Sequence, residues 1–248
     1  MVRVFTAFSG YDSQCIALDM AGVEYDLVGW SEIDPYAITA HNAIYPQFKD
    51  RNYGDITSIN WKDVPDFDLF TYSSPCQDFS KAGQLRGGQK GSGTRSSLLW
   101  SCEEAIRIKR PKFALMENVD NLVSERFFAL FKDWEQLLAE YGYNNQWKVV
   151  SAMDLGVPQN RNRVFLVSIL DPEQYFDFPA PANKVRDLDE YLEDDQAVAK
   201  KYFVKKEKLE LLDESDEIEN AGRKGEERKE THNPGGYPTL FAEGRLFL

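Results

Sequence analysis

Short apolar runs alternate with amphipathic segments along the first 170 residues of the chain. The apolar runs predict strands at residues 3–8, 27–33, 67–72, 113–116, 147–152 and 164–170. The segments between them predict helices at residues 12–21, 97–110 and 127–141, each followed by a glycine or a proline that ends it. This alternation is typical of an α/β fold with a doubly wound, mostly parallel, Rossmann-like sheet, whose ligands bind at the carboxyl ends of the strands.

The pattern changes after Asp171. Pro172, Pro179 and Pro181 interrupt it, and residues 186–230 are rich in charge, with one helix expected around residues 205–212. We therefore divide the chain into an α/β domain at residues 1–170 and a second region at residues 171–248.

Hydrophobic residues make up 42% of the 248 residues and charged residues 28%, as in an ordinary folded protein. No apolar run approaches the length of about 18 residues that a membrane span needs, and the N-terminus lacks a signal peptide. We therefore expect a cytoplasmic protein with no membrane partner. The three cysteines have no C-x-x-C spacing and the two histidines lie far apart, so we expect neither a disulfide framework nor a bound metal.

The net charge of −12 argues against nucleic acid as a partner, because a phosphate backbone attracts a basic surface. One loop departs from this trend, since residues 81–95 contain no acidic side chain and four basic ones, Lys81, Arg86, Lys90 and Arg95. Glycines recur along the same loop and permit movement. Such a loop can contact phosphates on an otherwise acidic protein.

Polar residues follow the first strands. The first strand runs through Phe8-Ser9-Gly10-Tyr11-Asp12-Ser13 into a helix, a turn that brings backbone N–H groups to a ligand. Glu32 follows the second strand, where a carboxylate would meet ribose hydroxyls. Asp55 could accept from an adenine amino group, or be a turn residue only. The chain has no G-x-G-x-x-G motif, which favours a nucleoside-containing cofactor other than a nicotinamide dinucleotide.

A thiol and a carboxyl group follow two further strands. Cys76 stands in Ser73-Ser74-Pro75-Cys76-Gln77 and Glu117 stands in Glu117-Asn118-Val119. Parallel strands would bring them to one edge of the sheet as a nucleophile and an acid, although a free cysteine is also often a small buried hydrophobic residue. Arg161 and Arg163 precede the last strand two positions apart, so they point to the same side.

Four motifs therefore stand at strand ends, namely Phe8-Ser9-Gly10, Pro75-Cys76-Gln77, Glu117-Asn118-Val119 and Gln159-x-Arg161-x-Arg163. In this order they resemble the cytosine-C5 DNA methyltransferase family of bacteria and phages, over residues 2–170. The resemblance implies S-adenosylmethionine as the cofactor. It makes residues 1–170 the catalytic and cofactor-binding domain and residues 171–248 a linker with a partial target-recognition region. The implied cofactor contacts are Phe8, Ser9, Gly10, Tyr11, Asp12, Ser13, Glu32, Ile33, Asp55, Ile56, Pro75 and Leu98.

The resemblance also implies covalent chemistry on a cytosine flipped out of duplex DNA. The Cys76 thiolate adds to C6 of the base, which makes C5 nucleophilic enough to take the methyl group. Glu117 binds N3 and the exocyclic amine, Arg163 binds O2, and Arg161 binds a neighbouring phosphate. The other implied substrate contacts are Gln77, Ser80, Lys81, Arg86, Lys90, Arg95 and Asn118.

The chain departs from the family pattern in places. Tyr11-Asp12-Ser13 stands where glycines are usual and Ser74 where a bulkier residue is frequent, but neither change removes a reacting group. The family's closing segments do not occur before Leu248, so we expect a fragment, a chain that needs a second polypeptide to supply them, or a defective copy.

Other readings of the chain stay open. One is an RNA cytosine-C5 methyltransferase of the same architecture, and another is an inactive subunit that acts as a binding module. A cysteine hydrolase is disfavoured, because His41 and His232 stand in no triad context.

Overall fold

The computed structural model describes residues 1–75, 95–182, 184–194 and 197–199, and only the backbone of residues 95–97. The chain divides into two compact units, Met1–Arg186 and Asp187–Leu248. The described part of the second unit contains the short 3-10 helix η6 (Leu188–Tyr191), which Asp187 caps together with Glu190. The helix expected around residues 205–212 lies outside the described residues, and the functional division at residue 170 stays a prediction.

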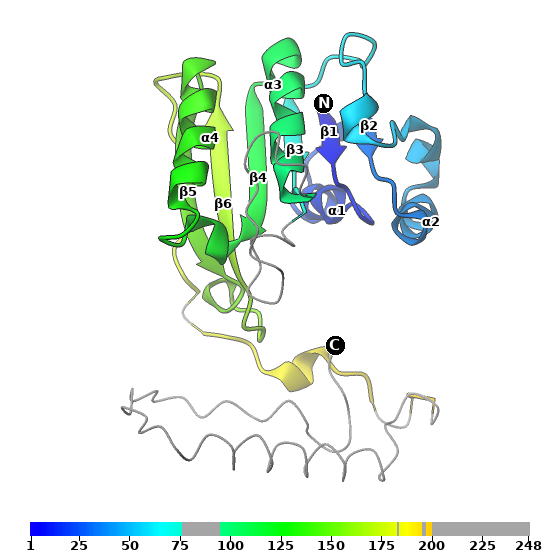
Figure 1. Cartoon of the computed structure of the whole chain (residues 1–248). Coiled ribbons are helices and arrows are strands. Elements are labelled where there is room, and N and C mark those ends of the chain that lie inside the picture. Colours follow the sequence, from blue (N-terminus) through cyan, green and yellow to red (C-terminus); the bar gives the residue numbers. More distant parts are fainter. Residues whose placement is uncertain (76–94, 183, 195–196, 200–248) are drawn as a thin grey trace, which may run out of the picture. The chain divides into compact units, whose positions relative to one another are not determined.

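The first unit is built on a six-stranded sheet. Its strands are β1 (Val2–Ala7), β2 (Tyr25–Ser31), β3 (Leu69–Tyr72), β4 (Phe113–Val119), β5 (Asn144–Ser151) and β6 (Asn162–Ile169), in the order β2-β1-β3-β4-β6-β5 (Figure 1). Strands β1 to β4 run parallel, whereas β6 is antiparallel to both β4 and β5. The link from β5 to β6, residues 152–161, is too short for the crossover that a parallel neighbour needs. The predicted α/β fold with a mostly parallel sheet is confirmed.

Helices cover both faces of this sheet. They are α1 (Ser13–Met20), α2 (Pro35–Ile44), α3 (Cys102–Lys109) and α4 (Phe128–Glu140). Successive residues of β1 point to opposite faces. Val4 therefore packs in a cluster with Cys15 of α1 and Ile38 of α2, while Phe5 lies in a larger cluster with residues of α3 and α4. Figure 1 shows α3 and α4 in front of the strands, so the sheet is the middle of three layers.

All six predicted strands are present, with ends that differ by a few residues. Strand β4 is longer than predicted, because it continues through Glu117 and Asn118 to Val119. The helix predicted at residues 97–110 is wrong over residues 97–101, which belong to the 3-10 helix η3 (Arg95–Ser101), and is confirmed over α3. The apolar pattern does not predict α2, although Asp34 at the N-cap and Pro35 at the first helical position are typical start signals.

No helix in the described ranges is long and apolar enough to cross a membrane. The same described residues contain no group of three or more His, Cys, Asp or Glu side chains that could hold a metal ion.

Candidate active site

The turn between β1 and α1 has an unusual backbone. Phe8, Gly10 and Asp12 have positive φ angles of 56°, 58° and 69°, so the chain alternates into the left-handed region at every second residue. The Asp12 N–H donates to the Ser9 carbonyl at 2.8 Å, which closes the turn. A Cβ atom added to Gly10 would meet no other atom within 4 Å, so the space beside this residue is open.

The side chain of Asp12 stabilises this turn through hydrogen bonds to the neighbouring elements. Its side chain is fully buried, and its carboxylate accepts from the Thr6 hydroxyl at 2.9 Å and from the Cys15 N–H at 3.4 Å, which caps α1. His41 of α2 is also fully buried, with Nε2 3.4 Å from the Asp12 carboxylate and its ring stacked on Trp30. The Asp12 side chain therefore contacts protein and does not face a ligand. Its side chain supports the turn, and the expected contact of the turn's backbone at residues 9–13 with the cofactor stays a prediction.

Glu32 lies directly after β2 and joins two chain segments. Its carboxylate accepts from the Gly10 N–H at 2.9 Å, from the Ile33 N–H at 2.8 Å and from the Asp34 N–H at 2.9 Å. These charge-assisted bonds fix an anionic group beside the open space at Gly10. The Ile33 side chain is 69% exposed.

Asp55 stands on the next segment, beside the end of β2. A single parallel bridge joins Trp30 of β2 to Asn52, so this segment takes the place of a further edge strand. Asp55 caps the 3-10 helix η2 (Ile56–Ser58) by accepting from the Thr57 N–H at 2.9 Å. Its exposed carboxylate and the buried Ile56 are thus presented at the carboxyl edge of the sheet.

These residues fit the cofactor that the resemblance implies. The Ser9 side chain is 4% exposed, and its hydroxyl has no hydrogen-bond partner among the described residues, which a buried polar group normally has. It lies in the same turn as the open space beside Gly10, and Glu32 holds a carboxylate there. A hydroxyl donor, backbone N–H groups and a carboxylate are the partners that an amino-acid group and a ribose need.

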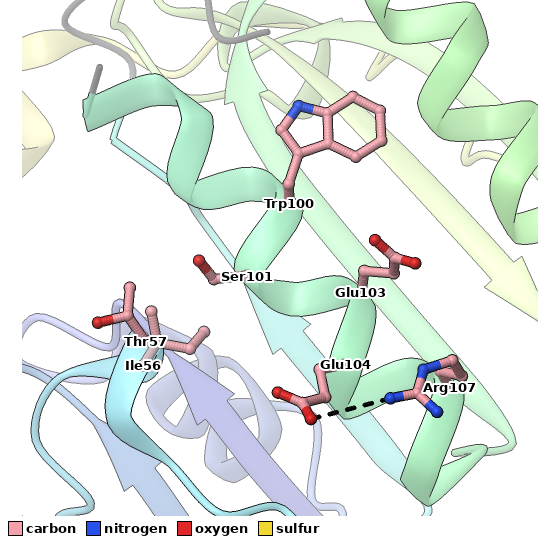
Figure 2. A pocket seen from close by; sticks show the side chains of 7 residues that line it. All are labelled: Ile56, Thr57, Trp100, Ser101, Glu103, Glu104 and Arg107. Atoms are coloured by element: carbon pink, nitrogen blue, oxygen red, sulfur yellow. Dashed lines mark ion pairs between the residues drawn. The ribbon is translucent and has the colours of Figure 1, made fainter. Parts of the chain in front are cut away.

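A pocket of about 270 Å³ lies between η2 and the segment formed by η3 and α3. Figure 2 shows Ile56 and Thr57 on one side of it and Trp100, Ser101, Glu103, Glu104 and Arg107 on the other. Ile56 thus lies close to the 3-10 helix that contains Leu98, and the contact of both residues with the cofactor stays a prediction. Apart from Trp100 the rest of the lining is polar, and Arg107 is 3.8 Å from Glu104, so we do not assign the pocket itself to the cofactor.

The end of β3 is anchored to β4. The buried amide of Asn118 donates to the Ser74 carbonyl at 3.1 Å and lies 3.3 Å from the Ser74 hydroxyl. Asn118 is 2% exposed and its side chain holds the end of β3, while its expected contact with the substrate stays a prediction. Pro75, the residue before Cys76, is thereby held at the edge where β4 carries Glu117.

Several predicted residues cannot be placed. Cys76, Gln77, Ser80, Lys81, Arg86 and Lys90 lie outside the described residues, and the side chain of Arg95 is not described.

Glu117 and Arg163 meet on neighbouring strands. Val119 of β4 stands opposite Arg163 of β6, and Glu117 is two positions before Val119 on the same face. Arg163 Nε lies 2.9 Å from Glu117 Oε1, with both side chains partly exposed. Arg161 precedes the strand and is exposed. The antiparallel direction of β6 is what brings its first residues to the carboxyl end of β4.

Sequence reasoning misses three residues of this site. Thr6 and His41 support the β1–α1 turn, and Asn52 contacts the segments of both Glu32 and Asp55. A polar residue within an apolar strand is a weak signal for Thr6. His41 and Asn52 have no local signal, because their partners come from other segments of the chain.

Comparisons with known proteins identify the class. The family model for C-5 cytosine-specific DNA methylases matches residues 2–239. The solved S. pombe Dnmt2 methyltransferase has the same fold, with a TM-score of 0.66 and 22% identity over 85% of this chain and 66% of that chain. The fold is therefore that of the Rossmann-like, S-adenosylmethionine-dependent methyltransferases. The chain belongs to the C-5 cytosine-specific DNA methylase family.

Two relatives show how much of the family's length is present. The type II methyltransferase M2.ScrFI of Lactococcus lactis subsp. cremoris is 38% identical over 256 residues, which cover 83% of this chain and 71% of that protein. The orphan methyltransferase M.Rho11sI of Bacillus phage rho11s is 35% identical over 168 residues, which cover 68% of this chain and 33% of that protein. The chain thus spans only part of these relatives.

Proposed function

We propose that this chain transfers the methyl group of S-adenosylmethionine to C5 of a cytosine in duplex DNA. The ion pair between Arg163 and Glu117 carries the proposal, because it holds a carboxyl group at the strand edge where the chain leads into Cys76. Membership of a DNA methylase family supports DNA as the substrate.

The cofactor is assigned to the edge formed by the β1–α1 turn, Glu32 and Asp55. Glu32 binds the ribose hydroxyls, Ser9 and the backbone of the turn bind the amino-acid part, and Asp55 accepts from the adenine amino group. Phe8 and Ile56 flank the adenine ring. When bound, the cofactor supplies an electrophilic methyl group on a sulfonium. The remaining assigned contacts are Gly10, Tyr11, Asp12 through its backbone, Ser13, Ile33, Pro75 and Leu98.

Cys76 and Glu117 act on the base. The thiolate forms a bond to C6, the electrons of the C5–C6 double bond shift toward N3, and N3 takes the proton that it shares with the Glu117 carboxyl group once the base is bound. C5 then forms a bond to the methyl group as the sulfonium bond breaks. A base removes the C5 proton, the bond between sulfur and C6 breaks, and N3 returns its proton to Glu117. Arg163 binds O2 of the base and orients the Glu117 carboxyl group.

The cytosine must leave the duplex to reach this edge, which costs a few kcal/mol that other contacts offset. We assign that task to the basic loop at residues 80–95, with Arg161 on a neighbouring phosphate. Asn118 keeps the Ser74–Pro75 segment in place beside Glu117.

The test is transfer of labelled methyl from S-adenosylmethionine to mixed-sequence duplex DNA by the full chain. We expect label on C5 of cytosine, and none with Cys76→Ser. Cys102→Ala is the matched control: this cysteine is buried in the core, so the variant should lose stability and keep the activity. Label that persists in Cys76→Ser would refute the covalent mechanism.

Two further experiments distinguish the proposed function from an RNA methyltransferase and from a chain that needs a second polypeptide. Structured RNA offered in competition with duplex DNA should not reduce the label on DNA, and preferential labelling of RNA would support an RNA methyltransferase instead. A folded chain that binds S-adenosylmethionine and labels nothing would contradict the proposal for this chain alone. It would support a requirement for a second polypeptide.

A further inference from the structure

The side chain of Asn52 joins the two segments that carry the polar cofactor contacts. Its Oδ1 accepts from the Glu32 N–H at 3.2 Å and from the Gly54 N–H at 2.9 Å. Its Nδ2 donates to the Glu32 carbonyl at 3.1 Å. One amide group thus binds both backbone groups of Glu32 and the residue directly before Asp55.

Two other hydrogen bonds also join these segments, but Asn52 alone binds the backbone of Glu32 from the neighbouring segment among the described residues. Tyr53 donates its N–H to the Trp30 carbonyl at 2.8 Å, and the Ser31 hydroxyl donates to the Gly54 carbonyl at 2.6 Å. Both bonds run between β2 and the segment of Asn52, but neither involves Glu32. Gly54 itself has a φ of +69°, a left-handed conformation that glycine adopts readily and most other residues adopt rarely.

The position of Glu32 depends on this amide. The Glu32 carboxylate accepts from three backbone N–H groups. The backbone N–H and carbonyl of Glu32 both bind the Asn52 amide. A shift of the Glu32 backbone moves the carboxylate away from the Gly10 N–H. It also moves the carboxylate relative to Asp55.

We propose that Asn52 is a positioning residue for the cofactor, whose amide fixes Glu32 and the Gly54–Asp55 turn at the spacing that the ribose and the adenine require. This inference rests on the proposed function, since it takes S-adenosylmethionine as the ligand of Glu32 and Asp55. Asn52 itself need not touch the cofactor.

The test measures binding of S-adenosylhomocysteine, the demethylated product, to the full chain by calorimetry. We expect Asn52→Ala to weaken binding about 10- to 100-fold, because buried hydrogen-bonding groups lose their partners. Asn144→Ala is the matched control, since Asn144 also joins two chain segments through its amide, at the Pro172 and Gln174 carbonyls. The control should lose stability to a similar extent and keep its affinity for the ligand.

A double-mutant cycle with Glu32→Ala separates positioning from a general loss of structure. Asn52→Ala should weaken binding much less when Glu32 is already absent, whereas independent effects would add and overturn the inference. Asn52→Asp keeps the two accepted bonds and loses the donated one, so it should bind several-fold less tightly. If Asn52→Ala does not fold, Asn52→Asp tests the inference in its place. An Asn52→Asp variant with the affinity of the unaltered chain would then overturn the inference.

The outcome also distinguishes this inference from the proposed function. If the unaltered chain does not bind S-adenosylhomocysteine, the proposed function fails and the inference fails with it. If the unaltered chain binds and Asn52→Ala binds equally well, only the inference fails.

Discussion

Arg163 Nε lies 2.9 Å from Glu117 Oε1, and the two residues come from strands of opposite direction. A guanidinium group is planar and presents its donors in a fixed fork, so it sets the orientation of the carboxyl group beside it. The backbone of Asn162 fixes the other side of the guanidinium, since Arg163 Nη1 donates to its carbonyl at 2.7 Å. The pair therefore fixes the orientation of the Glu117 carboxyl group in the chain alone.

The first prediction concerns the proton of Glu117. Glu117→Gln keeps the size of the side chain but cannot deliver a proton to N3, so we expect kcat to fall about 10²- to 10⁴-fold. The affinity for S-adenosylhomocysteine should stay unchanged. Single-turnover methyl transfer to duplex DNA measures the first quantity and calorimetry the second. A variant with wild-type kcat would exclude Glu117 from the chemistry.

The second prediction concerns Arg163. Arg163→Lys keeps the charge and loses the planar fork, so kcat should fall about tenfold or more. Arg161→Lys is the matched control, because Arg161 is exposed and is assigned to a phosphate. Because lysine keeps the charge that a phosphate contact needs, this variant should leave kcat and the salt dependence of KM for DNA nearly unchanged. Equal effects of the two substitutions on kcat would contradict the special role of Arg163.

The third prediction concerns the open space beside Gly10. Gly10→Ala places a methyl group in that space and forces a left-handed conformation on alanine, which costs about 1–2 kcal/mol. Gly22→Ala has the same backbone strain and the same open surroundings, with a φ of +67°, but lies after α1 and away from the site. The two variants should lose similar stability in urea, and only Gly10→Ala should lose affinity for S-adenosylhomocysteine. If both variants bind S-adenosylhomocysteine equally well, the cofactor does not occupy the space beside Gly10.

The strand ends could be predicted from the sequence because short apolar runs bounded by turns are local signals. Glu117 follows such a run, and the structure places it at the expected edge even though β4 is longer than predicted. The antiparallel direction of β6 has no such local signal. The hydrogen bonds of Asn52 and His41 could not be predicted either, because each depends on which distant segments the fold brings together.

The side-chain contacts of Asp12 could not be predicted from the sequence either. Its place in a glycine-rich type of turn predicts a backbone contact with the cofactor and does not predict where the side chain lies. In the structure its side chain points to Thr6 and the start of α1. Asp tolerates the left-handed conformation that the turn requires, and its carboxylate adds a cap that glycine cannot supply.

The fourth prediction follows from that cap. Asp12→Ala leaves the buried Thr6 hydroxyl and the Cys15 N–H without their partner, so it should destabilise the chain by about 2 kcal/mol or more. Asp34→Ala removes the exposed cap of α2 and should cost only about 1 kcal/mol. Urea unfolding measures both losses. Equal losses would show that burial of the Asp12 network adds nothing to its stabilising effect.

The last prediction concerns the reactivity of the three cysteines at alkaline pH. Burial raises the pKa of the Cys102 thiol well above its ordinary value. Burial also raises the pKa of the Cys15 thiol, and the nearby Asp12 carboxylate adds to the shift. A raised pKa keeps a thiol protonated as the pH rises, and the protonated form is not the nucleophile. Cys15 and Cys102 should therefore stay unreactive at pH 8.

A disulfide exchange reagent such as dithionitrobenzoate should accordingly label one cysteine of the native chain quickly at pH 8, and Cys76→Ser should abolish that fast phase. Guanidinium should make all the cysteines reactive, because unfolding removes the burial that raises the pKa of Cys15 and Cys102. A fast phase that survives in Cys76→Ser would mean that one of the buried thiols is reached in the native state. The nucleophile would then have to be sought among those thiols.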